Sequence, residues 1–118
     1  MRIWDISPSL LCRQHLLGEH RELHAVWSVI IKKKRGYSKH PETIRWIGKL
    51  KALYTRHLTL VEEMKKRNYN HKSNLAPHFA LGNKKQDVFI NTISEQIEIL
   101  KKKSCLCFTA SAVKERKY

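Results

Sequence analysis

Apolar residues recur every three or four positions along most of the chain, a spacing that predicts amphipathic helices. The first helix is expected from Ser9 to about Lys33. Ser7-Pro8 favours its start, since Ser caps a helix and Pro suits the first helical position. Gly36 favours its end. At 100° per residue its apolar positions fall in a sector of about 60°: Cys12, Leu16, Leu23, Trp27 and Ile30.

Two more helices are expected downstream. The second begins at Pro41-Glu42, ends near Asn68, and has an apolar face of Ile44, Ile47, Leu50, Leu53, Leu60, Val61 and Met64. Residues 69–85 are polar, contain Pro77 and Gly82, and indicate a long loop. The third helix runs from about Gln86 to Lys103 and places these residues inward: Val88, Phe89, Ile93, Ile97 and Leu100.

These patterns predict an all-α fold: a compact single domain over residues 1–118, of about three helices. Residues 1–6 are expected to form an extended N-terminal arm, and residues 104–118 a basic tail. A chain of 118 residues with 42% hydrophobic content is sufficient for one core.

The charge of the chain indicates its partner. There are 24 Lys and Arg against 10 Asp and Glu, a net charge of +14. Such an excess favours a polyanion, nucleic acid first. No stretch approaches the roughly 20 apolar residues that span a bilayer, and no signal peptide is evident. Three cysteines form no disulfide framework, so a cytoplasmic protein, nucleoid-associated through DNA binding, is expected.

One carboxylate of the first helix is a candidate for chemistry. With His15 at 0°, Glu22 falls at about 340°, away from the apolar stripe centred near 85°. The small residues Gly18 and Ala25 flank it and leave it approachable. The alternative is an ordinary exposed glutamate in an ion pair with Arg21 or a lysine.

The amino terminus favours the chemical interpretation. Glu22 lies roughly 20 Å along the helix, and six extended residues also reach about 20 Å. An arm folded back along the helix would thus bring the Met1 α-amine beside Glu22. With a pKa of about 7.7–8.0, an α-amine forms imines at neutral pH far more readily than an ordinary lysine. Initiator Met is normally retained before a bulky residue such as Arg2, so the nucleophile would be Met1 itself.

The chain resembles the pyrimidine-dimer DNA glycosylase family, the endonuclease V type of UV-damage repair enzyme. The resemblance is carried by Gln14-His15-Leu16, Glu19 and Arg21-Glu22-Leu23 at the family's spacing from the N-terminus. A weaker match is Lys66-Arg67-Asn68-Tyr69-Asn70. The resemblance covers roughly residues 1–70.

The resemblance implies a DNA glycosylase with associated abasic-site (AP) lyase activity on UV-damaged duplex DNA. Met1 would stand for the family's N-terminal nucleophile and Glu22 for its essential carboxylate. The reaction would need no cofactor, no metal and no obligate protein partner, and by analogy the enzyme would be a monomer. Four residues match those lining the family's DNA-facing pocket: Arg2, Gln14, His15 and Arg21.

Two departures from the family leave alternatives open. Ala25 stands where the family has an arginine that grips DNA, and the family's aromatic-rich C-terminus is replaced by Cys105-Leu-Cys107-Phe108 and a basic tail. One alternative is an AP lyase without dimer specificity. The other is a non-catalytic basic helical protein that binds DNA or RNA.

Charge and position add further expected DNA contacts: Lys33, Lys34, Arg35 and Arg45.

A metal site is the remaining rival interpretation. His20 and His24 are four residues apart, but Arg21 follows His20, so the motif is not His-Glu-x-x-His. Cys105 and Cys107 do not have the usual zinc spacing either. No metal site is therefore expected.

Overall fold

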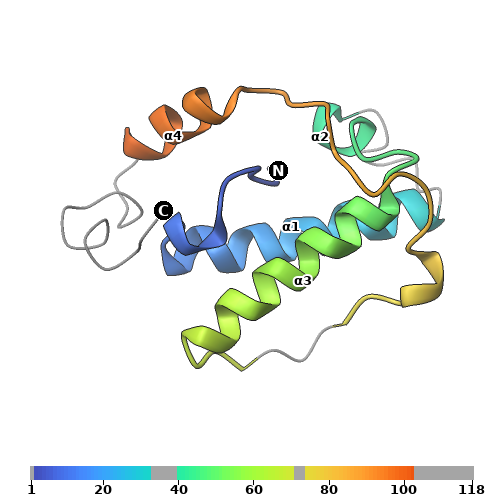
Figure 1. The fold of residues 1–118 in the computed structure, drawn as a ribbon, viewed down its shortest axis with the longest axis horizontal. Coiled ribbons are helices and arrows are strands. Elements are labelled where there is room, and N and C mark those ends of the chain that lie inside the picture. Colours follow the sequence, from blue (N-terminus) through green and yellow to red (C-terminus); the bar gives the residue numbers. More distant parts are fainter. Residues whose placement is uncertain (1, 33–39, 71–73, 103–118) are drawn as a thin grey trace.

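The computed structural model describes residues 2–32, 40–70 and 74–102, and within these ranges it is helical and contains no strand. Two long helices cross each other, and the N-terminal arm lies between α1 and the segment that leads into α4 (Figure 1). The expectation of an all-α domain is confirmed. In the described ranges no helix is long and apolar enough to cross a membrane.

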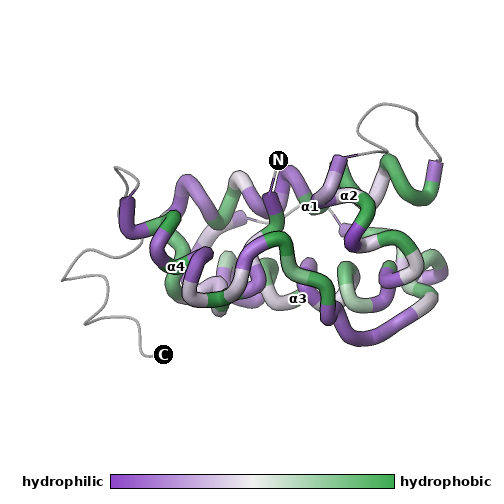
Figure 2. Tube along the Cα trace, turned by 90° about the horizontal axis from the view of Figure 1, so that it is seen from above, coloured by the Kyte–Doolittle hydropathy of each residue, from purple (hydrophilic) through white to green (hydrophobic). Residues whose placement is uncertain are grey.

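The first helix forms close to where the sequence predicts it. A short 3-10 turn, η1 (Pro8–Leu10), precedes α1 (Arg13–Lys32). The predicted apolar stripe is buried at Cys12, Leu16, Leu23 and Trp27, and Ile30 packs against the same core from a half-buried position. Figure 2 shows hydrophobic and hydrophilic residues alternating along this helix.

The predicted second helix is two helices. The short α2 (Pro41–Ile44) ends in a turn, and α3 (Leu50–Lys66) begins after Gly48, whose φ of 76° no α-helix accommodates. The turn exposes Ile44 and Ile47, so their prediction as core residues is wrong. The end near Asn68 is confirmed: Asn68 adopts a φ of 62°, and the Tyr69 N–H donates back to the Met64 carbonyl at 2.8 Å.

The third predicted helix starts later than expected. The 3-10 turn η2 (Pro77–Phe79) interrupts the polar loop, and α4 spans only Ile93–Lys101. Thr92 and Glu95 form a capping box, which fixes the start of α4 at this point. Val88 and Phe89 therefore lie in an extended segment and are exposed, contrary to the prediction that they face inward.

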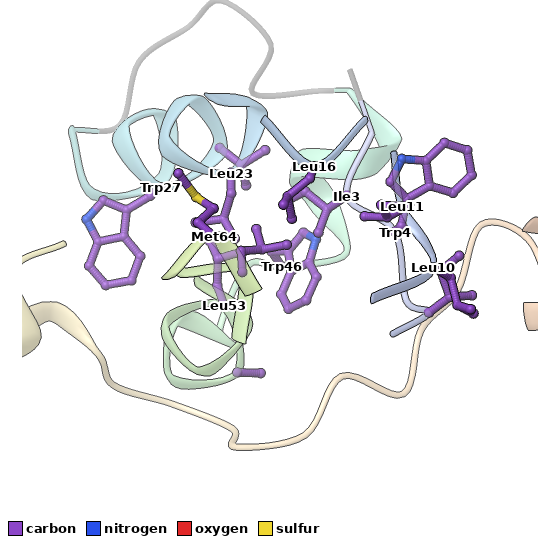
Figure 3. Packing of buried hydrophobic residues seen from close by; sticks show 14 of the residues in the cluster. Ile3, Trp4, Leu10, Leu11, Leu16, Leu23, Trp27, Trp46, Leu53 and Met64 are labelled. Carbon is purple, nitrogen blue, oxygen red and sulfur yellow. The ribbon is translucent and has the colours of Figure 1, made fainter. Parts of the chain in front are cut away.

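The core extends from the two long helices into the N-terminal arm. Ile3 of the arm lies beside Leu16 of α1 and Trp46 of the α2–α3 turn (Figure 3). Trp4 is also buried, at 5% exposure. The arm is thus part of the packed core, which fixes its course relative to α1.

Candidate active site

Arg45 connects the N-terminal arm to the rest of the fold. Its guanidinium donates to the Ile3 carbonyl at 2.8 Å, the Asp5 carboxylate at 3.0 Å and the Val88 carbonyl at 2.9 Å. A fourth hydrogen bond, of 2.9 Å, goes to Glu42, one turn earlier on α2. Charge-assisted hydrogen bonds of this kind are roughly twice as strong as neutral ones. One buried cation therefore holds the arm at both Ile3 and Asp5.

A second arginine holds the arm against α1. Arg56 of α3 donates to both carboxylate oxygens of Glu19, at 2.6 Å and 2.9 Å, and to the Ile6 carbonyl at 2.7 Å. The backbone N–H of Trp4 also donates to Glu19. Burial raises the pKa of the Glu19 carboxyl, and the Arg56 guanidinium acts in the opposite direction. Glu19 is therefore an interior anchor that connects arm, α1 and α3.

The third set of arm contacts comes from α4 and the segment before it. The Gln96 side chain accepts from the Asp5 N–H at 2.8 Å and donates to the Asp5 carboxylate at 3.0 Å. Arg2 donates to the Asn91 side chain at 2.9 Å and stacks over the Trp4 ring. These contacts cover the arm on the side that faces away from α1.

The contacts of the arm place it over the first half of α1. Ile6 and Trp4 are both hydrogen-bonded to the pair formed by Arg56 of α3 and Glu19 of α1, and the Trp4 ring lies edge-on to His15 at 6.1 Å. Ile3 is bound by Arg45, which follows α2, and α2 in turn packs on α1. The arm therefore lies along α1 close to Glu19, one turn before Glu22.

Glu22 lies in the third turn of α1, outside the buried core. It is half-buried, and in the described part of the chain no cationic side chain forms a salt bridge with it. The ion pair with Arg21 expected of an ordinary surface glutamate is thus not formed. One turn before it, a Cβ added at Gly18 would meet nothing within 4 Å. Among the described residues, the backbone at Gly18 is therefore not covered at the position of a Cβ, one turn before this carboxylate.

The residues predicted to bind DNA fall into different environments. Gln14 and Arg21 are exposed on α1, where they can contact a ligand. His15 is half-buried, with Nδ1 3.2 Å from the Cys12 sulfur, and Arg2 is half-buried against Asn91. All four belong to the arm or to the first three turns of α1, so the structure brings them to one part of the molecule.

Arg45 does not fit the expectation of a DNA contact. Its side chain is 2% exposed, and its guanidinium is fully occupied by protein oxygens. That expectation is corrected: Arg45 positions the arm from inside the fold. Met1, Lys33, Lys34 and Arg35 lie outside the described residues.

Three residues important for this region were missed on sequence grounds. Arg56 and Gln96 hold the arm, and each is distant from it in the sequence. His57 places a third imidazole beside His20 and His24. These three residues act through contacts between different elements of the fold, and hydrophobic periodicity along the sequence does not predict such contacts.

Comparison with known proteins assigns the chain to a family. Searches of curated proteins and of solved structures found no match. A family model described as pyrimidine dimer DNA glycosylase matches residues 1–77. This match covers the arm, α1, α2 and α3, and therefore includes Glu22 and the arm's anchors on these helices. The chain belongs to the pyrimidine dimer DNA glycosylase family.

Proposed function

We propose that this protein is a DNA glycosylase with associated AP lyase activity on duplex DNA that contains pyrimidine dimers. The Met1 α-amine is the nucleophile and Glu22 is the assisting carboxylate. The observation that carries the proposal is the packing of the arm on α1: Arg45 and Arg56 hold it there, and the Trp4 N–H donates to Glu19, one turn before Glu22. Family membership supports the substrate class.

The chemistry divides into two steps. In the first, the unprotonated α-amine attacks C1′ of the damaged nucleotide, a C1′–N bond to the protein forms, and the bond from C1′ to the base breaks. The negative Glu22 carboxylate stabilises the positive charge that develops on the sugar. The amine loses one proton to the departing base. The sugar ring then opens as the C1′–O4′ bond breaks, O4′ takes up the second amine proton, and an imine between Met1 and C1′ remains.

In the second step the imine makes the C2′ proton acidic. Glu22 assists its removal as a general base. The electron pair moves into the C2′–C3′ bond, the C3′–oxygen bond breaks, and the 3′ phosphate leaves. Water then hydrolyses the imine and restores the amine. Every group needed for these steps is an amine, a carboxylate or water.

The exposed residues around Glu22 suit a DNA substrate. Gln14 and Arg21 are accessible, and the net charge of +14 favours phosphate contacts. A sugar inside a duplex is not reachable by a helix face, so we infer that the nucleotide is extruded toward α1. The lack of a side chain at Gly18, where an added Cβ would meet nothing described within 4 Å, supports an approach of the sugar to the carboxylate from this side.

The direct test compares the parent with Glu22→Gln on a duplex carrying one pyrimidine dimer and on a duplex carrying one abasic site. Glu22→Gln should cleave neither duplex while binding both. The matched control is Glu62→Gln, which changes an exposed carboxylate on α3 and should leave cleavage unchanged. Parent-like cleavage by Glu22→Gln would refute the assignment.

The same assay separates the alternatives. Cleavage of the abasic duplex alone by the parent would identify an AP lyase without dimer specificity. Binding of both duplexes without cleavage of either would identify a non-catalytic DNA-binding protein.

A further inference from the structure

Three histidines converge between the two long helices. The Nε2 atom of His57, on α3, lies 3.2 Å from Nε2 of His20 and 3.2 Å from Nε2 of His24, both on α1. All three candidate ligand atoms lie within 4.8 Å of one another. We propose that His20, His24 and His57 bind one divalent transition-metal ion of the zinc class, which links α1 to α3.

The helices hold the three rings in place. His20 and His24 are four residues apart, so they project from the same face of α1. His57 is 2% exposed, and its neighbours one turn away on α3, Leu53 and Leu60, are fully buried. The packing of α3 on α1 thus orients His57 toward the other two rings. A metal ion would not have to reorganise the backbone to find its ligands.

The distances suit a metal ion. Two nitrogens bound to zinc at about 2.0–2.1 Å with a tetrahedral angle lie about 3.3 Å apart. The two separations of 3.2 Å from His57 agree with this value. A hydrogen-bonded cluster suits the geometry less well, because a neutral Nε2 has either one proton to donate or one lone pair to accept. His57 Nε2 cannot make two full hydrogen bonds, whereas a cation accepts a lone pair from each ring.

The ligand type selects the ion. Imidazole suits zinc, copper, nickel and related ions, whereas magnesium and calcium prefer oxygen ligands. Three protein ligands leave a fourth position, and the half-buried His20 and His24 leave room for water to reach it. The ion would not take part in the proposed DNA chemistry, because on α1 these histidines lie about 160° from Glu22 around the helix axis. Its role would be structural, to fix α1 against α3.

The proposal revises the sequence-based expectation of no metal site. On sequence alone, His20 and His24 form a pair without a third ligand. The third ligand is 33 residues beyond His24, on a different helix. Only the packing of α3 on α1 reveals it.

Metal binding is tested by titrating the metal-free full-length protein with Co²⁺ and then displacing it with Zn²⁺. Cys105 and Cys107 are replaced by serine in every sample, so that thiolates do not contribute. One Co²⁺ per chain should bind and give the visible absorption of a tetrahedral site, and one equivalent of Zn²⁺ should abolish that absorption. Mg²⁺ at the same concentration should leave it unchanged.

Ligand variants then locate the ion. His24→Asn and His57→Asn should each weaken Zn²⁺ affinity by at least about 100-fold, since loss of an outer-shell partner alone costs about 10–100-fold. His78→Asn, which removes an exposed imidazole outside the cluster, should bind as the parent does. If circular dichroism shows that His57→Asn loses its helices, the Zn²⁺ affinity of His24→Asn alone tests the site. No tetrahedral Co²⁺ site in the parent, or parent-like Zn²⁺ affinity in His24→Asn, would overturn the proposal.

Discussion

The Arg45 guanidinium donates a 2.8 Å hydrogen bond to the Ile3 carbonyl and so ties the N-terminal arm to the turn that follows α2. Both residues are buried, with Ile3 at 1% exposure and Arg45 at 5%. An extended arm of six residues ordinarily makes few fixed contacts. Here a buried cation determines where its first residues lie.

Arg45→Met should destabilise the fold strongly. The variant leaves Asp5 and Glu42 without their shared cation, and breaking a buried ion pair by removing one partner costs about 3–5 kcal/mol. Urea unfolding followed by circular dichroism measures the loss. A decrease in the free energy of unfolding of less than about 1 kcal/mol would show that the ion pairs of Arg45 contribute no more than exposed surface pairs.

Gly18 offers a test of the proposed approach of the sugar to Glu22. Gly18→Ala should raise the free energy of unfolding by up to about 1 kcal/mol, because Ala is the better helix former and its Cβ meets nothing within 4 Å. Gly18→Phe adds an aromatic ring to the space that the sugar is proposed to use. It should fold and bind DNA, yet cleave at least tenfold more slowly, as gel assays would measure.

Parent-like cleavage by Gly18→Phe would show that the substrate approaches Glu22 from another side. The Gly18→Ala variant serves as its control, because it changes the same position with little added volume.

Arg21 is predicted to contact a phosphate. Binding to an undamaged duplex should weaken steeply as salt rises, with a slope of about −0.9 per phosphate neutralised. Arg21→Gln should weaken binding and reduce that slope by about one contact, whereas Lys101→Gln, at the far end of α4, should not. Fluorescence anisotropy at several salt concentrations provides both values. An unchanged slope in Arg21→Gln would remove Arg21 from the DNA interface.

The sequence predicts those parts of the fold that depend on local pattern. The apolar stripe of α1 and the helix end near Asn68 follow from spacing and from a residue that tolerates positive φ. The break at Gly48 was not predicted, because the apolar period continues through it. Ile44 and Ile47 keep that period but lie exposed on the turn.

The candidate site likewise has one part that the sequence predicts and one part that it does not. The position of Glu22 outside the buried core follows from its angle around one helix, and the half-buried side chain agrees with that angle. The burial of Arg45 depends on Asp5, Glu42 and two backbone carbonyls from distant segments. A charged residue between two helices is more often exposed, and only the tertiary structure shows that its charge is matched inside.

The proposed reaction requires the α-amine of Met1 to form an imine with the sugar. The most direct measurement incubates the protein with a duplex carrying one abasic site, adds borohydride, and locates the reduced adduct by peptide mass spectrometry. We expect one covalent adduct, on the Met1 amine, and an uncleaved N-terminal extension should abolish its formation. An adduct on a lysine side chain, or none while the duplex is cleaved, would contradict the proposed reaction.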